Sequence, residues 1–210
     1  MNLVTEPWIP VLHRNGERQL ASLQQVFAEG GDYADLSVRP HERIALMRLL
    51  IAVAQAALDG PKDIGEWDLA RKQLPSAAAE YLKDVRDAFD LFHPTHPFLQ
   101  IAELEECSEK ETFATKLDFA LASGRGSTLF DHSGIPEVGE KQRERVFAPE
   151  SLALMLLTYQ NFSPSGGLPV AKWGKIRTGQ VGNPDAPCIP GSMCHTFLRG
   201  SNLLSNIHLN

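Results

Sequence analysis

The 210-residue sequence has few cysteines and no long apolar stretch, and each absence excludes a class of protein. Three cysteines are too few, and odd in number, for a disulfide framework, so the sequence predicts a protein of the reducing cytoplasm. The most apolar window, residues 44–58, is interrupted by polar side chains and is shorter than the ~20 residues that cross a bilayer. The first residues lack the basic start and apolar run of a secretory signal. We therefore expect a cytoplasmic protein with no membrane partner.

Acidic residues are missing between Glu150 and Asp185, and this gap divides the charge of the chain. Residues 1–140 hold 23 acids and 13 bases, whereas residues 141–210 hold 3 acids and 7 bases. The formal net charge of −6 therefore conceals a basic C-terminal third. Such asymmetry is typical of contact with a polyanion, although a solvated basic loop would give the same pattern.

The apolar pattern predicts a helix-rich α+β domain with small N-terminal sheets or hairpins and long Gly/Pro-rich loops. The Asn15-Gly16 dipeptide predicts a hairpin that joins residues 8–12 to residues 19–23, and residues 3–4 are expected to be extended. The predicted helices cover residues 41–58, residues 76–92 with Ser76 as the N-cap, and a segment that starts near Pro149. Gly/Pro-dense residues 163–191 and the region around Phe130 are expected to be functional loops.

Several motifs suggest catalysis or metal binding, but their spacing does not support either. Six residues, not four, separate Gly167 from Gly174-Lys175, and Ile176 replaces the Ser or Thr of a Walker loop. The consecutive residues 131–133 (Asp-His-Ser) cannot form a hydrogen-bonded relay. We therefore expect no catalytic residues and no enzyme activity.

Two groups of side chains have the chemistry of metal ligands without the spacing of a structural zinc site. His93 and His96 are separated by a proline, and Cys188, Cys194 and His195 lack paired C-x-x-C spacing. We expect packing or capping roles for the histidines and no metal or other cofactor. Whether the two cysteines contact a metal is left open by the sequence.

A binding surface is the remaining candidate site. Glycines let a backbone approach a phosphate or a groove closely, and Lys172, Lys175 and Arg177 follow the Gly166-Gly167 pair. Trp173 lies among these cations and could stack on a base or anchor a core. We expect Lys172, Lys175 and Arg177 to contact nucleic-acid backbone.

The order of five short segments resembles a known family. They are residues 8–11 (Trp-Ile-Pro-Val), 96–100 (His-Pro-Phe-Leu-Gln), 129–132 (Leu-Phe-Asp-His), 163–167 (Ser-Pro-Ser-Gly-Gly) and 196–200 (Thr-Phe-Leu-Arg-Gly). Their series resembles the large subunit (CasA family) of the type I-E CRISPR surveillance complex, Cascade. The resemblance runs across nearly the whole chain, although each segment alone is weak.

The resemblance implies a non-catalytic subunit of an RNA-guided antiviral complex. Such a subunit recognises the protospacer-adjacent motif (PAM) in foreign double-stranded DNA, aids initiation of the R-loop and docks the helicase–nuclease. Protein then reads the short motif, while base pairing with the guide RNA reads the rest. The implied partners are the other Cascade subunits, the guide RNA, target DNA and the helicase–nuclease.

The resemblance also implies roles for particular residues. Phe130 matches the loop phenylalanine of the family, which is implicated in target recognition. Gly166 and Gly167 match the glycine loop that reaches the minor groove, although the family loop is often richer in glycine. Family members usually continue beyond residue 210 into a C-terminal helical bundle, so we expect residues 1–210 to form the N-terminal domain of a longer protein. The alternatives are a phosphate- or nucleotide-handling enzyme that uses the basic Gly-rich loop, and a pure scaffold.

Overall fold

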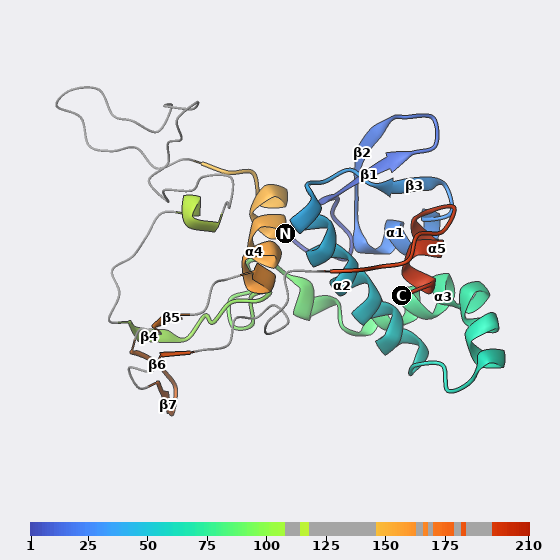
Figure 1. Cartoon of the computed structure of the whole chain (residues 1–210). Coiled ribbons are helices and arrows are strands. Elements are labelled where there is room, and N and C mark those ends of the chain that lie inside the picture. Colours follow the sequence, from blue (N-terminus) through green and yellow to red (C-terminus); the bar gives the residue numbers. More distant parts are fainter. Residues whose placement is uncertain (108–113, 118–145, 163–165, 168–169, 179–181, 184–194) are drawn as a thin grey trace, which may run out of the picture. The chain divides into compact units, whose positions relative to one another are not determined.

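The computed structural model describes residues 1–107, 114–117, 146–162, 166–167, 170–178, 182–183 and 195–210. The chain divides into two compact units, one made of residues 1–100 and 194–210 and the other of residues 101–193. The second unit is therefore inserted, in sequence, between two segments of the first. Helices and short antiparallel sheets make up the described residues, which confirms the predicted helix-rich α+β class (Figure 1).

The first unit contains a three-stranded antiparallel sheet in the order β2-β1-β3. Strand β1 (Ile9–His13) pairs with β2 (Arg18–Ala21) and with β3 (Tyr33–Leu36). The hairpin predicted from Asn15-Gly16 is confirmed, and Gly16 has the positive φ of +88° that its turn requires.

The predicted start and end of this strand region need two corrections. Residues 3–4 lie in a turn rather than in a strand, and the Asn2 side chain accepts a 3.1 Å hydrogen bond from the Val4 amide. At the other end, Ser22 leaves the sheet and caps α1 (Leu23–Glu29), with its Oγ accepting a 3.2 Å bond from the Gln25 amide. Local hydrogen bonds by small polar side chains therefore end the extended backbone earlier than composition suggests.

Helix α2 (Pro40–Leu58) confirms the predicted helix 41–58. Pro40 occupies the first turn, where no backbone N–H is needed, and the chain leaves the helix through Asp59 in the left-handed region, with φ of +54°. One broad face of the helix is buried, whereas Arg48, Ala52 and Gln55 are exposed.

Helix α3 (Ile64–Asp84) starts 12 residues before the predicted helix, so the assignment of Ser76 as its N-cap is wrong. Asp63 is the N-cap, and a 3₁₀ turn, η1 (Arg86–Phe89), follows the helix instead of a continuation to residue 92. Pro75 lies inside α3, where a proline costs about 3 kcal/mol. The helix passes through it because buried small and apolar side chains recur every four residues on both sides of the proline: Ala70, Leu74, Ala78 and Leu82.

The core of the first unit lies between the sheet and helices α1, α2, α3 and α5 (Leu203–His208), which gather on one side of the sheet (Figure 1). Trp8 is 1% exposed, and its indole N–H donates a 2.9 Å hydrogen bond to the Leu3 carbonyl. The fully buried large side chains of this unit are Leu3, Trp8, Ile9, Leu23, Phe27, Tyr33, Leu36, Leu46, Leu50, Leu74, Leu82 and Leu203. Such burial is the main source of stability in a domain of this size.

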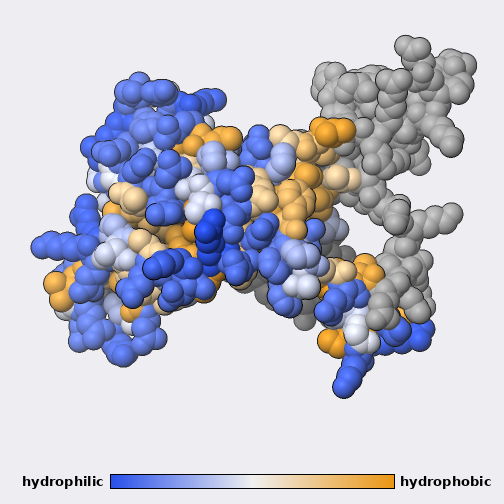
Figure 2. All heavy atoms as spheres, turned by 180° about the vertical axis from the view of Figure 1, so that it is seen from behind, coloured by the Kyte–Doolittle hydropathy of each residue, from blue (hydrophilic) through white to orange (hydrophobic). Residues whose placement is uncertain are grey.

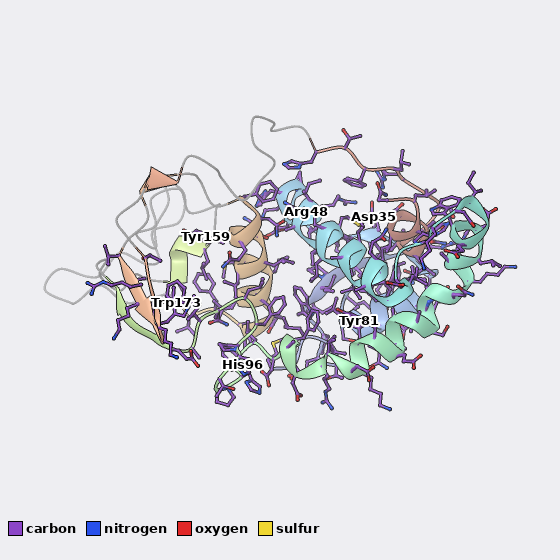
Figure 3. The ribbon with its side chains drawn as sticks, turned by 90° about the horizontal axis from the view of Figure 1, so that it is seen from below. Asp35, Arg48, Tyr81, His96, Tyr159 and Trp173 are labelled. Atoms are coloured by element: carbon purple, nitrogen blue, oxygen red, sulfur yellow. The ribbon has the colours of Figure 1, made fainter. Side chains whose placement is uncertain are left out.

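A buried carboxylate joins distant parts of the first unit. The Asp35 side chain, 9% exposed, accepts hydrogen bonds from the Leu36 amide at 2.8 Å and from Arg199 at 2.5 Å, and it also pairs with Arg43 (Figure 3). Arg43 reaches it from α2, and Arg199 precedes α5, so strand β3 is tied to both. We call Asp35, Arg43 and Arg199 the Asp35 centre.

The second unit contains one helix and several short strands among its described residues. Helix α4 (Pro149–Phe162) confirms the helix predicted near Pro149. Strands β4 (Leu104–Cys107), β6 (Ala171–Trp173) and β7 (Ile176–Arg177) form an antiparallel sheet in the order β4-β6-β7. Strand β5 (Gly166–Gly167) pairs with β8 (Gly182–Asn183), and η2 (Ala114–Leu117) is a 3₁₀ turn. Part of the predicted Gly/Pro-rich loop is therefore sheet.

Candidate nucleic-acid interface

The three predicted basic residues lie on one hairpin. Strands β6 and β7 pair with Trp173 opposite Ile176 and Lys172 opposite Arg177, so Gly174 and Lys175 form a two-residue turn. Gly174 has φ of +52°, which a two-residue hairpin turn requires and which glycine adopts without strain. Thr178 closes the open end, because its Oγ accepts a 2.8 Å bond from the Ala171 amide and its own amide donates to the Ala171 carbonyl at 2.9 Å. We call residues 171–178 the basic hairpin.

This turn removes the structural basis for a phosphate-binding loop at Gly174-Lys175. A Walker loop curls successive N–H groups around a phosphate ahead of a helix. Here the two residues reverse the chain between two strands instead. Nothing in this geometry favours the nucleotide-handling enzyme.

Cross-strand pairing sorts the side chains of the small sheet into two rows. Directly opposed residues of an antiparallel pair lie on the same face. One row contains Lys172 and Arg177, with Glu106 of β4 at the position opposite Lys172. The other row contains Leu104, Trp173 and Ile176. The sheet therefore has one charged face and one apolar face.

The charged row places two cations opposite each other. Like charges in that position destabilise a strand pair, and a nearby anion offsets this cost. Lys175 and Arg177 are exposed, at the turn and on the outer strand of the sheet.

The glycines predicted to approach a minor groove form strand β5. Gly166 pairs with Asn183 and Gly167 with Gly182, so two short glycine-bearing segments lie side by side. Three of the four paired residues are glycines, which carry no side chain. The structure thus places Gly166 and Gly167 in the same unit as the basic hairpin, whereas Phe130 lies outside the described residues.

His93 and His96 make their contacts within their own loop. His93 Nδ1 accepts hydrogen bonds from the His96 amide at 3.0 Å and from the Thr95 amide at 3.3 Å, and the two rings stack at 5.7 Å. The Nδ1 atom of His93 therefore caps the turn formed by residues 93–96, which agrees with the expected capping role. Within the part of the chain that the structure describes, no group of three or more His, Cys, Asp or Glu could hold a metal ion. Cys188 and Cys194 lie outside the described residues.

The sequence did not indicate a hollow between α3 and α5 of the first unit. It has a volume of about 500 Å³ and is lined by Trp67, Asp68, Arg71, Lys72, Gly200, Ser201, Ser205, His208 and Leu209. Trp67 and His208 stack with ring centroids 4.3 Å apart, and burial followed by the nearby Arg71 charge lowers the pKa of His208. No short-range sequence pattern links residues so far apart.

The sequence also did not indicate the Asp35 centre. A charged residue inside the mostly apolar strand Tyr33–Leu36 was the available signal, because carboxylates are seldom buried without a cation. Arg199, the exposed residue of this centre, belongs to the segment of residues 196–200 that resembles the family. The ion pair with Asp35 therefore gives this segment a structural role. Its geometry is structural rather than catalytic.

Among the described residues, no helix combines the length and apolar character needed to cross a membrane.

Comparisons with known proteins agree on one family. The sequence model of CRISPR-associated protein Cse1 matches residues 2–210. CasA/Cse1 of Thermus thermophilus is 35% identical over 213 aligned positions, which cover all of this chain and 39% of that protein. The crystal structure of Thermobifida fusca Cse1 superposes with a TM-score of 0.76 at 27% identity, covering 100% of this chain and 39% of that one.

A chain of a CRISPR RNA-guided surveillance complex shares the fold, with a TM-score of 0.70 at 22% identity. The whole of the present chain aligns with 43% of the length of that chain. The chain therefore spans about two fifths of the length of the relatives that it matches, as expected for the N-terminal portion of such a subunit.

Proposed function

Because the chain belongs to the CRISPR-associated Cse1 family, we propose that it acts as a non-catalytic subunit of an RNA-guided surveillance complex in the cytoplasm. Its task in this proposal is to recognise the protospacer-adjacent motif in foreign duplex DNA, to aid R-loop initiation and to provide a docking surface for the helicase–nuclease. The other subunits of the complex, the guide RNA and the target duplex are its partners. The match of the Cse1 family model along residues 2–210 is the observation that carries this proposal.

The second unit supplies the residues of the proposed DNA contact. Gly166 and Gly167 offer a backbone without side chains, which suits the narrow minor groove and its degenerate pattern of donors and acceptors. Lys172, Lys175 and Arg177 of the basic hairpin contact the phosphate backbone. Phosphate contacts fix position, and the glycine backbone reads the motif.

The test is reconstitution of the assembled complex with guide RNA, followed by binding of duplexes with and without the motif. Gly166→Leu and Gly167→Leu each abolish the preference for motif-bearing duplex, because a bulky side chain keeps the backbone away from the groove. Gly31→Ala is the matched control, since a Cβ at residue 31 meets nothing within 4 Å. Unchanged discrimination in the leucine variants contradicts the minor-groove assignment.

Salt dependence separates phosphate contacts from motif reading. Lys175→Ala and Arg177→Ala weaken binding of all duplexes to a similar degree, and each reduces the slope of log K against log salt by about 1. Motif preference stays intact in both variants. A change in preference without a change in slope would exclude these residues as backbone contacts.

Phe130 is tested separately because its proposed role rests on the family resemblance. Phe130→Ala weakens target capture by the assembled complex while the thermal stability of the isolated chain stays unchanged. Normal capture removes Phe130 from the site. Saturable nucleotide hydrolysis that depends on Lys175 would overturn the non-catalytic assignment.

A further inference from the structure

The hollow between α3 and α5 lies entirely in the first unit, where these two helices contact each other (Figure 1). Its volume of about 500 Å³ is in the range of small-molecule sites. Its walls combine charged side chains of α3, the hydroxyls of Ser201 and Ser205, and the stacked rings of Trp67 and His208. Hydrophilic residues also predominate on the face of the first unit that Figure 2 shows, at the left. The hollow therefore offers a small ligand both charged and aromatic groups.

The charged side chains that line the hollow all come from α3, and they do not balance. Asp68 stands three residues before Arg71 and four before Lys72, so all three lie on neighbouring positions of the helix surface. One carboxylate offsets only one of two cations. Among the described residues, no acidic side chain forms an ion pair with Arg71 or Lys72. The hollow therefore keeps a net positive charge.

The guanidinium of Arg71 is held against α5 by a buried hydroxyl. Its Nη2 donates a 3.2 Å hydrogen bond to the Oγ of Ser205, a residue that is 6% exposed. This bond leaves most of the N–H groups of the guanidinium for other acceptors, and the Arg71 side chain is exposed. The planar fork of an arginine matches two oxygens of one oxyanion, and its orientation here is set before a ligand arrives.

His208 senses the unbalanced charge from the α5 side of the hollow. Its ring stacks on Trp67 with centroids 4.3 Å apart. Burial, followed by the charge of Arg71, lowers the pKa of His208, whereas Asp68 acts more weakly in the opposite direction. An anion on Arg71 relieves this repulsion and favours the imidazolium. The same ring therefore serves as an internal reporter of anion binding.

We propose that the hollow between α3 and α5 binds the oxyanion group of a small molecule, a phosphate ester or a carboxylate, on the guanidinium of Arg71. Ser205 holds the guanidinium in place, and Lys72 adds a second cation at the next position of α3. Net positive charge, a preorganised arginine and a volume of this size together favour a small anion. The proposal goes beyond the proposed function, because every residue of the hollow lies in the first unit.

The direct test follows the ring protons of His208 by nuclear magnetic resonance during a pH titration of the 210-residue chain. His208→Gln identifies the signal among the seven histidines. Sodium sulfate is the probe, because its charge stays constant over the titration, and sodium chloride at equal ionic strength is the reference. We expect sulfate to raise the pKa of His208 by about half a pH unit. The same pKa in both salts overturns the proposal.

Matched variants assign the effect to Arg71. Arg71→Gln removes the effect of sulfate and weakens sulfate binding about 10-fold, whereas Arg71→Lys retains part of both, because it keeps the charge without the planar fork. Lys83→Gln, which removes an exposed cation from the last turn of the same helix, changes neither. An effect of sulfate that persists unchanged in Arg71→Gln overturns the proposal.

Asp68→Asn keeps the test independent of folding, because it leaves the bond between Arg71 and Ser205 intact. We expect this variant to bind sulfate a few-fold more tightly, since the competing carboxylate is removed. Unchanged affinity contradicts the proposed balance of charge. Inorganic phosphate and acetate then distinguish the two sources of the oxyanion: tighter phosphate binding indicates a phosphate ester, and tighter acetate binding indicates a carboxylate. If neither anion binds, the proposal is wrong.

Discussion

Trp8 of the first unit and Trp173 of the second lie in very different settings, and the contrast shows how differently two indoles contribute to one chain. Trp8 in the first unit is enclosed and donates its indole N–H to a backbone carbonyl. Trp173 in the second unit stands in a half-exposed row on a three-stranded sheet. Burial of the Trp8 indole stabilises the first unit, whereas the Trp173 indole, which keeps part of its surface in water, adds less to the stability of the second.

The largest expected difference comes from removing either indole. Trp8→Ala leaves a cavity and an unsatisfied carbonyl, and it lowers the free energy of unfolding by about 3–5 kcal/mol. Trp173→Ala costs about 1 kcal/mol or less, because its side chain is already partly solvated. Urea unfolding followed by far-UV circular dichroism measures both changes. Equal losses of unfolding free energy in the two variants would contradict the expected difference between an enclosed and a half-exposed indole.

Removal of the buried carboxylate tests how far long-range polar contacts support the first unit. Asp35→Ala leaves Arg43 and Arg199 facing each other without an anion and lowers the free energy of unfolding by about 2–3 kcal/mol. Arg199→Ala costs about 1 kcal/mol, since Arg199 is 67% exposed and its ion pair is screened. If both variants unfold at the urea midpoint of the wild type, the Asp35 centre does not stabilise the unit.

Glycine positions give a smaller and more local comparison. A Cβ at Gly200 would lie 2.5 Å from the Ser205 Cβ, so Gly200→Ala forces α5 to shift and costs about 1–2 kcal/mol. Gly31→Ala, in open space, changes stability by at most a few tenths of a kcal/mol. Thermal unfolding of both variants at one pH is sufficient, and a neutral Gly200→Ala would show that the approach of α5 is looser than described.

The smallest effect is expected from the pH dependence of one buried hydroxyl. Burial, and then the hydrogen bond to Glu29 at 2.6 Å, raise the pKa of Tyr33 from 10.0 to about 12. The fold therefore favours the protonated phenol, and this contribution is complete below pH 10 and is lost as the pH rises from 10 to 12. Tyr33→Phe flattens the fall in unfolding midpoint over that range. An unchanged slope in Tyr33→Phe would mean that other groups govern alkaline unfolding.

The sequence predicted those elements whose signals are local. An Asn-Gly turn indicated the first hairpin, and dense apolar positions indicated α2 and α4, all of which the structure confirms. The predicted start of α3 was wrong because Ser76 was assigned as the N-cap, whereas buried residues before and after it sustain a helix that begins at Ile64. Burial against a partner element is not visible in a window of neighbouring residues.

The sequence named residues for the candidate site but not the strands with which they pair. Lys172, Lys175 and Arg177 were named from the sequence, and they do lie on one hairpin. Strand β4, which contains Glu106, pairs with β6, which contains Lys172. The division of charge between residues 1–140 and residues 141–210 assigned β4 to the acidic part and β6 to the basic part, although these two strands pair. The pairing spans more than 60 residues, so only the tertiary structure reveals it.

Both borders of the inserted unit are fastened inside the first unit. On the leading side, the Phe98 amide donates to the Asp90 carbonyl at 2.8 Å, and on the trailing side the Gly200 amide donates to the Asn206 side chain at 2.7 Å. The first unit therefore fixes both ends of the inserted unit. Residues 101–193 can therefore diverge in length and chemistry, in nature or by grafting, while both fastenings stay the same.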